Sequence, residues 1–147
     1  MPTAKQPRTT NSFKLVIGGA EAAGIFREVT GLDSESEITE FKHAADNGRN
    51  EIIKVPGAVK NSNVELKRGV DTSMDLWKWR DEVVKSGPEN ARKDCQLMLI
   101  DYDGSPIVTY TLKRAWPAKY VGASLNAGAN EVAMESLTLA HEGLERQ

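Results

Sequence analysis

The stretch from Val64 to Pro88 changes its hydrophobic period partway along, and this change constrains the fold more than any other feature of the sequence. Its first seven residues, VELKRGV, alternate between hydrophobic and polar side chains in the manner of a β-strand. Residues 73–86 repeat their hydrophobic side chains with the period of an α-helix instead. The chain is therefore expected to combine strands with one helix over about residues 73–86.

The expected helix has a hydrophobic arc and a charged face. Thr72 is its expected N-cap, and Gly87 with Pro88 is its expected end. Arg80 projects from within the hydrophobic arc, so it needs solvent, a carboxylate or another chain. The side chains expected to pack on the protein's own sheet are Leu76, Trp77, Trp79, Val83 and Val84. The charged face consists of Asp75, Lys78, Asp81, Glu82 and Lys85.

The rest of the chain reads mainly as β-strands. The segment SFKLVIGG places Phe13, Leu15 and Ile17 on one face, and GIFREVTGL reads as a second strand. The segment from Cys95 to Gly122 reads as two long strands around the turn DYDGSP. The final segment, NEVAMESLTLAHEGL, fits either a helix or a strand whose register shifts near Ser136, and the strand with a bulge there is favoured.

Residues 34–55 read as an extended β-hairpin with an unusual composition. Two strand-like segments flank the turn ADNGRN, and the second is expected to close at Pro56-Gly57. Polar side chains lie on both faces, so the hairpin alone could not bury enough hydrophobic surface to stay ordered. It suits a ribbon that docks through its backbone on a neighbouring subunit. A mobile hairpin loop on a monomer is the alternative.

Composition and motifs narrow the class of protein. A chain of 147 residues with a net charge of −2 is expected to form one soluble domain with no bulk attraction to nucleic acid or membrane. The only cysteine, Cys95, is expected to be buried and unreactive. His43 and His141 lie outside any metal-ligand spacing, and no phosphate loop, dinucleotide fingerprint or nucleophile elbow is present. We therefore expect no enzyme activity, metal or cofactor.

The N-terminal segment is not expected to be a secretory signal peptide. Residues 1–11 are polar and are expected to form a flexible extension before a single domain at 12–147. They lack the hydrophobic segment of a secretory signal peptide, and no run approaches the roughly 18 hydrophobic residues of a membrane span. We expect a protein made in the cytoplasm, without membrane anchoring.

Five segments together resemble the inner tube proteins of contractile injection systems. This family includes contractile-tail phage tail tubes, R-type pyocin tubes and extracellular injection particles, with the type VI secretion tube protein as a more distant relative. The matching segments cover about residues 13–144 in the family's order. They are FKLVIGG, FREVTGLDSESEITEFKH, KVPGAVKNSNVELKRGV, LWKWRDEV and the run from LIDYDGSP to LTLAHEGL.

The resemblance implies a fold and an assembly. It implies a six-stranded antiparallel β-barrel with one packed helix, and it makes the final segment a strand. It also implies hexameric rings that stack into a hollow tube inside a contractile sheath. Its expected partners are the sheath protein, the baseplate or spike, the terminator, and effector cargo or DNA in the lumen. The chain would then be found in assembled injection particles or virion tails.

The resemblance also gives roles to the hairpin and to the helix. The charged face of the helix would point outward, towards the sheath or a neighbouring subunit. The hairpin would join the ring's continuous sheet, help rings to stack and line the lumen. Its expected interface or lumen residues are Glu37, Glu40, Lys42, Arg49, Asn50, Glu51 and Lys54. The alternative function is a β-barrel binding module that is monomeric or forms a small oligomer.

Overall fold

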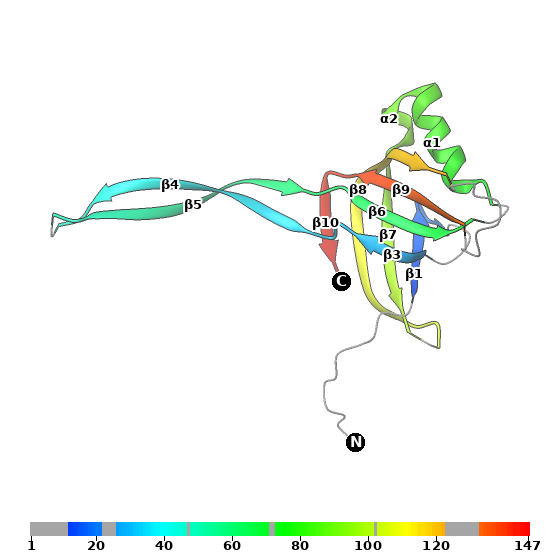
Figure 1. Cartoon of the computed structure of the whole chain (residues 1–147), viewed down its shortest axis with the longest axis horizontal. Coiled ribbons are helices and arrows are strands. Elements are labelled where there is room, and N and C mark those ends of the chain that lie inside the picture. The colour runs from blue at the N-terminus through cyan, green and yellow to red at the C-terminus, as the bar shows by residue number, and fades with distance from the viewer. Residues whose placement is uncertain (1–11, 22–25, 47, 71–72, 102, 123–132) are drawn as a thin grey trace, which may run out of the picture.

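The computed structural model describes residues 12–21, 26–46, 48–70, 73–101, 103–122 and 133–147. Six antiparallel strands hydrogen-bond in a closed ring that forms the body of the protein (Figure 1). Around the ring they are β8 (Pro106–Val121), β7 (Lys93–Ile100), β1 (Ser12–Ile17), β3 (Phe26–Thr30), β6 (Val64–Gly69) and β9 (Met134–Ala140). The ring confirms the expected mainly-β fold with six antiparallel strands.

A change of direction in β8 closes the ring. The first part of β8 pairs with β7, while its last residues, Trp116–Val121, pair with β9. Between them, Arg114 has a φ of 51°, the one positive φ at a non-glycine residue among those the structure describes. Its backbone N–H donates to Asp94 Oδ1 at 3.0 Å, so the exposed turn keeps its hydrogen bond. β8 therefore pairs with β7 along its first part and with β9 along its last part, and this closes the ring.

Two short strands extend the ring. β10 (Gly143–Arg146) pairs with β8, and β2 (Ala20–Glu21) pairs with β1. The turn between β9 and β10 is tied to the rest of the body by His141, whose Nε2 lies 2.9 Å from the Ser62 carbonyl oxygen.

The core lies inside the ring because alternate side chains of each strand point inward. Leu15, Val64 and Leu66 are fully buried, as are Leu137 and Leu139 across the β6–β9 pair. Cys95 is also fully buried, and burial raises the pKa of its thiol to about 12. An ordinary hydrophobic core thus stabilises the body.

The helix α1 (Asp75–Ser86) packs against the ring with three buried side chains, Leu76, Trp79 and Val83. The buried indole Nε1–H of Trp79 donates to the Ala91 carbonyl oxygen at 2.8 Å. The expectation that Val84 packs on the sheet is wrong, since 67% of this residue is exposed. Trp77 is 48% exposed and contacts the edge of Tyr120 instead of the core.

The ends of the helix differ from the expectation. The N-cap is Met74, which makes no side-chain cap bond, while Thr72 lies outside the described residues. Gly87 ends α1, but Pro88 then begins a second helix, α2 (Pro88–Ala91). Proline suits that first position because its missing N–H would have no helical partner there. The prediction of one lone helix was incomplete.

The C-terminal segment forms two successive strands, β9 and β10, and the break between them follows Ala140 instead of lying near Ser136. β9 pairs with β6 without a register shift from Met134 to Leu139, the irregularity in its ladder with β8 lies in β8 between Pro117 and Lys119, and the chain turns before β10. The bulge expected near Ser136 does not occur, because Glu135 takes the inward position beside Leu137. A buried glutamate, 6% exposed, therefore keeps the strand regular.

The hairpin consists of β4 (Ser34–Ala44) and β5 (Asn50–Asn61). It is longer than the expected 34–55 because β5 continues past Pro56 and Gly57. These two residues lie at a β-bulge, where the register shifts between the Ser36↔Val59 and Ile38↔Pro56 pairs. A bulge tolerates proline because the ladder is already interrupted there. We call this hairpin, residues 34–61, the arm.

Candidate assembly surface

The arm projects away from the body (Figure 1). Its strands pair only with each other, in a two-stranded sheet separate from that of the body. Among the described residues, the outer edges of β4 and β5 therefore have no strand beside them. A two-stranded hairpin is only marginally stable in water, and exposed edges are templates for pairing with another chain.

The arm also exposes hydrophobic side chains. Six of the eleven large hydrophobic residues that are exposed in the described part of the chain belong to it. They are Ile38 (66% exposed), Phe41 (54%), Ile52 (60%), Ile53 (44%), Val55 (39%) and Val59 (62%). Polar side chains do lie on both faces of the arm, as expected, but exposed hydrophobic side chains accompany them. So many exposed large hydrophobic side chains on one projecting element favour an interaction site.

The outer half of the arm has one hydrophobic and one charged face. Residues paired across the two strands point to the same side, so Phe41 lies beside Ile53, and Thr39 beside Val55. The other face carries the Glu40↔Lys54 and Lys42↔Ile52 pairs. Of the residues expected to lie at the interface or lumen, Glu40, Lys42, Asn50 and Lys54 share this charged face, and Glu51 lies opposite them.

The inner half of the arm reverses this arrangement. There, Ile38, Pro56 and Val59 lie on the same face of the ladder as Glu40. The opposite face carries the Glu35↔Lys60 pair and the Lys60–Glu37 ion pair of 3.1 Å. The hydrophobic side chains therefore change from one face of the ladder to the other near the bulge.

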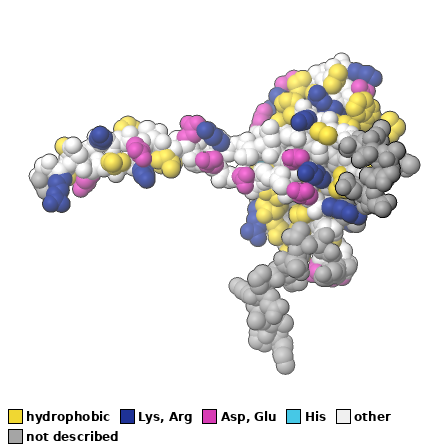
Figure 2. All heavy atoms as spheres, viewed as in Figure 1, with side chains coloured by type: hydrophobic (Ala, Val, Ile, Leu, Met, Phe, Trp, Pro, Cys, Tyr) yellow, Lys and Arg dark blue, Asp and Glu magenta, His cyan; other side chains and the backbone are white. Residues whose placement is uncertain are grey.

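The ribbon of the arm also twists along its length. Figure 1 shows β4 and β5 crossing over one another partway along the arm, so the ribbon turns over between its two halves. Figure 2 shows both charged and hydrophobic side chains along the side of the arm in view.

The last expected arm residue, Arg49, lies in the turn at the tip. Its carbonyl oxygen accepts a hydrogen bond from the Ala45 N–H at 2.9 Å. At the other end of the arm, Gly31 has a φ of +89° and would place a Cβ 2.0 Å from the Asn63 carbonyl oxygen. A side chain at that position would push apart the two segments of the chain that lead into and out of the arm.

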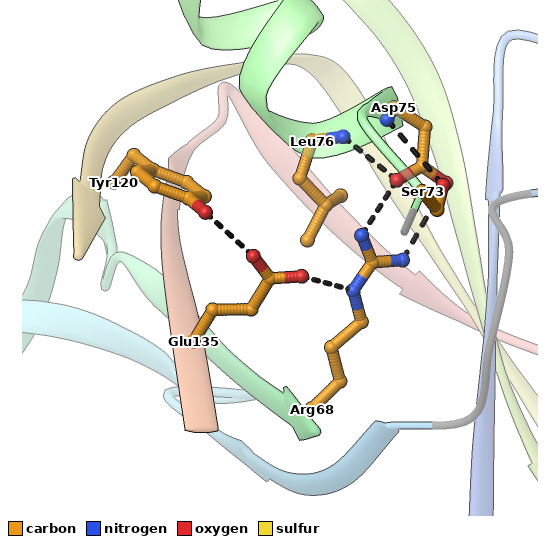
Figure 3. A network of polar contacts seen from close by, with 6 residues as sticks. All are labelled: Arg68, Ser73, Asp75, Leu76, Tyr120 and Glu135. Carbon is orange, nitrogen blue, oxygen red and sulfur yellow. Dashed lines mark hydrogen bonds and ion pairs between the residues drawn. The ribbon is translucent and has the colours of Figure 1, made fainter. Parts of the chain in front are cut away.

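A buried polar network fastens α1 to the end of the ring (Figure 3). Arg68 of β6, only 1% exposed, donates from Nε to Glu135 Oε1 and from Nη2 to Asp75 Oδ1, each at 2.6 Å. Tyr120 donates its hydroxyl to Glu135 Oε2 at 2.5 Å. The guanidinium of Arg68 also lies 5.6 Å from the centre of the Phe26 ring. Side chains from β6, β8, β9 and α1 are joined in this way.

The network alters the ionisation of two of its members. The hydrogen bond to Glu135, followed by burial, raises the pKa of Tyr120 to about 12. The pKa of Arg68 is also raised: burial lowers it, but hydrogen bonds to Asp75 and Glu135 outweigh that effect. The network therefore contains a charged guanidinium that is compensated within the protein.

The charged residues of α1 do not all point outward. The expectation for Asp75 is wrong, because it accepts hydrogen bonds from Arg68 and from the Leu76 N–H. Lys78 is exposed, and Lys85 pairs with Asp81 at 2.8 Å along the helix. Glu82 lies 3.8 Å from Lys93 of β7. Arg80 reaches the Pro117 carbonyl oxygen at 3.3 Å, which explains its place in the hydrophobic arc.

A second exposed hydrophobic surface lies at the end of the body where β6 and β8 stop and α1 starts. Its members are Val70 (46% exposed), Met74 (55%), Trp77 (48%) and Val121 (44%). We call it the pole patch. The Trp77 ring lies 5.4 Å from that of Tyr120 at an angle of 71°. The patch is therefore joined to the buried network beneath it.

In the part of the chain that the structure describes, no group of three or more histidine, cysteine, aspartate or glutamate side chains could hold a metal ion. The described helices are all too short or too polar to cross a membrane. A hollow of about 290 Å³ lies between α1 and β1, and its lining includes Trp79 and the Glu82–Lys93 ion pair.

Solved structures share this fold. The chain matches an extended extracellular contractile injection system, the PVC sheath-tube complex, over 96% of its length and 91% of that chain, with a TM-score of 0.76 and 23% identity. It matches the tube-terminating cap of the anti-feeding prophage over 100% of its length and 95% of that chain, with a TM-score of 0.74 and 22% identity.

The fold also extends to a more distant group. Hcp1 from Flavobacterium johnsoniae matches with a TM-score of 0.59 and 12% identity, over 92% of this chain and 94% of that one. These likenesses show the Hcp-like fold.

The sequence itself identifies the family. No curated protein matches it significantly. The family model of the T4-like virus tail tube protein gp19, however, matches residues 9–145, almost the whole chain. The matched residues include the six strands of the ring and the whole arm. The chain belongs to the T4-like virus tail tube protein family.

Proposed function

We propose that the protein is the subunit of hexameric rings that stack into the hollow inner tube of a contractile injection system or phage tail. One observation carries the proposal: the arm is incomplete as a part of a monomer. Its strand edges are open and six large hydrophobic side chains are exposed along it. A sister subunit would supply the missing contacts, and contacts between different surfaces of identical subunits close into rings or continue as filaments.

The hydrophobic side chains of the arm supply a useful free energy of association. Fully burying one such side chain contributes about 1.5–3 kcal/mol. Ile52 shares the charged face with Lys42, and the other five are about half exposed, so covering those five contributes roughly 4–8 kcal/mol per subunit. Backbone pairing at the open edges would add stiffness as well as affinity. An arm of this kind favours an ordered assembly over a free hairpin.

The charged side of the arm suits the wall of a channel. Glu40, Lys42 and Lys54 share its outer half, so both signs of charge are present. Such a wall attracts neither acidic nor basic cargo strongly, because single-signed fields trap oppositely charged molecules. In this function the sheath supplies the mechanical work, and the tube passes effector cargo or DNA. Asn50 would lie on the same side, whereas Glu51 would not.

The exposed charges of α1 would face outward in the tube. Lys78, Asp81, Glu82 and Lys85 are proposed to contact the contractile sheath or a neighbouring subunit. Asp75 is left out because Arg68 and the start of the helix already use its carboxylate. Baseplate, spike and terminator proteins would contact the two ends of the assembled tube. No step in this function requires catalysis or a cofactor.

Imaging tests the proposal directly. The purified protein should form six-fold rings or tubes in negative-stain micrographs, alone or when mixed with its sheath and baseplate proteins as templates. A binding module that is monomeric or forms a small oligomer would instead sediment as one small species at every concentration. Persistence of that small species beside sheath and baseplate proteins would overturn the tube proposal.

A further inference from the structure

The turn between β9 and β10, formed by His141 and Glu142, lies beside the root of the arm. At this root β5 ends at Asn61, and Ser62 leads on towards β6. The Asn61 side-chain amide donates to the Glu142 carbonyl oxygen at 3.1 Å, and His141 Nε2 lies 2.9 Å from the Ser62 carbonyl oxygen. Figure 1 shows β10 next to the base of the arm. The C-terminal turn therefore contacts the point where the arm rejoins the body.

The two sides of the root are attached by different kinds of contact. On the entering side, Leu32 packs against the hydrophobic core. On the leaving side, residues 61–63 are Asn-Ser-Asn and supply no hydrophobic side chain. The two segments approach closely where Gly31 meets the Asn63 carbonyl oxygen. The polar contacts of the C-terminal turn therefore hold the leaving side, and a change in them would alter the direction of the whole arm.

The imidazole ring of His141 faces a carbonyl oxygen at each of its two nitrogens. Nε2 lies 2.9 Å from the Ser62 oxygen, and Nδ1 lies 3.1 Å from the Gly143 oxygen. Carbonyl oxygens only accept hydrogen bonds, and a neutral imidazole has one N–H and one bare nitrogen. Either neutral tautomer would therefore leave one carbonyl oxygen opposite a bare nitrogen. A ring with a proton on both nitrogens donates to both oxygens.

We propose that His141 is a protonation-dependent clamp at the root of the arm. With both ring nitrogens protonated, it joins Ser62 of the root to Gly143 of β10 and fixes the direction of the arm. Loss of one proton removes one of these hydrogen bonds and loosens the root. The clamp is therefore most fully closed in acid, and it opens as the pH rises through the range in which histidine changes charge. The inference concerns the free subunit and does not depend on assembly.

The charged side chains near the turn pair with one another. They are Glu142 with Arg114 (3.5 Å), Lys113 with Glu145 (3.9 Å), Lys67 with Glu65 (4.0 Å) and, at the base of the arm, Lys60 with Glu37 (3.1 Å). Asp33 and Glu35 at the start of the arm are exposed. Carboxylates ordinarily titrate below about pH 5, and lysine and arginine above about pH 10. Histidine is the class of side chain that responds between these limits.

The first test measures the direction of the arm in the monomer. Nitroxide labels on Lys54→Cys of the arm and Val84→Cys of α1 report the distance between the two elements, and the fully buried Cys95 stays unlabelled. The protein is kept at concentrations at which it sediments as a monomer. From about pH 5.5 to about pH 8.5, the fraction of displaced arms should rise about tenfold, the factor expected for one charge-assisted hydrogen bond. A distance distribution that is the same at both pH values would overturn the clamp.

Matched variants assign the response to the ring. His141→Gln, which cannot gain a proton, should give the same distribution at both pH values. His43→Gln is the control, because this exposed histidine lies in β4 away from the root, and its pH response should equal that of the unmodified protein. Asn61→Ala removes the other contact of the turn, so it should loosen the arm at both pH values and keep the pH response. A pH response that survives His141→Gln would overturn the role of His141.

NMR of the ring nitrogens ties the movement to the proton. The chain has two histidines, so in the His43→Gln variant all imidazole signals come from His141. The midpoint at which one ring nitrogen loses its proton should coincide with the midpoint of the arm displacement measured by the labels. Two separate midpoints would overturn the proposal. Fluorescence of the buried Trp79 should be the same in every variant, which shows that the body stays folded.

Discussion

Replacing Glu135 by glutamine should strongly destabilise the body of the protein. Glu135 is 6% exposed and accepts hydrogen bonds from Arg68 Nε at 2.6 Å and from Tyr120 at 2.5 Å. Glutamine has nearly the same shape, so the change removes the negative charge with little change in packing. The guanidinium of Arg68 would then be buried with one of its two carboxylate partners missing.

The magnitude follows from the burial. Breaking a buried ion pair by removing one partner costs about 3–5 kcal/mol, because the remaining charge is left without compensation. Asp75 still faces Arg68 at 2.6 Å and is 28% exposed, which favours the lower end of that range. We expect a loss of about 3 kcal/mol in the free energy of unfolding. For a domain of this size, that corresponds to a fall of about 10 °C in Tm.

Urea unfolding should be followed at concentrations at which the protein sediments as a monomer, since assembly otherwise adds to the apparent stability. Glu145→Gln is the matched control: this glutamate pairs with Lys113 at 3.9 Å and is 61% exposed, so its loss should change stability by less than about 0.5 kcal/mol. The double variant Arg68→Met/Glu135→Leu removes both charges and should regain part of the lost stability, since Asp75 then loses Arg68 and Tyr120 loses its acceptor.

Two results would contradict this reasoning. A loss below about 1 kcal/mol for Glu135→Gln would mean that water or Asp75 compensates Arg68 fully. A double variant as unstable as the sum of its two single variants would mean that packing, and not the uncompensated charge, determines the cost.

Three further outcomes are expected. Gly31→Ala should lower Tm and disturb the arm, because its Cβ would lie 2.0 Å from the Asn63 carbonyl oxygen. Gly104→Ala is the control: Gly104 also has a positive φ, but a Cβ there would have nothing within 4 Å, so the substitution should cost only about 1 kcal/mol. Equal losses of stability in the two variants would contradict the clash at Gly31. The pKa of Tyr120 is raised to about 12 by its hydrogen bond to Glu135, so the stability it contributes is complete below about pH 10 and is lost as the pH rises towards 12. Absorbance at 295 nm should therefore be the same for the unmodified protein and Tyr120→Phe at pH 10.5, and an extra tyrosinate in the unmodified protein would contradict this. Because burial raises the pKa of Cys95 to about 12, its thiol should react with Ellman's reagent at pH 8 only after denaturation, and rapid reaction of the folded protein would contradict that placement.

The sequence alone predicted the elements whose hydrophobic period is clear. Alternation in the segments around Leu15 and Leu66 predicted strands, and the helical period predicted α1, because these patterns arise from backbone geometry. The end of α1 at Gly87 was predicted for the same kind of local reason, since glycine readily adopts the φ of 83° found there. The closed ring and its family followed from the resemblance, which the family model confirms.

Some predictions were wrong because the residue that determines a side chain's position lies far away in the sequence. Glu135 points inward because Arg68, 67 residues earlier, compensates its charge, and no local pattern contains that information. The same arginine turns Asp75 away from the outer face of α1. Val84 belongs to the hydrophobic arc in the sequence, but the ring covers only the part of the arc that contains Leu76, Trp79 and Val83.

For the arm, too, some features followed from the sequence and others only from the tertiary structure. The sequence by itself determined that residues 34–55 form a hairpin that cannot bury enough hydrophobic surface to be stable alone. Only the tertiary structure decided its sides, because the Pro56–Gly57 bulge changes the register and the twist turns the ribbon over between its two halves. A side chain's direction along a strand alternates with every residue, so one extra residue in one strand is enough to exchange the faces.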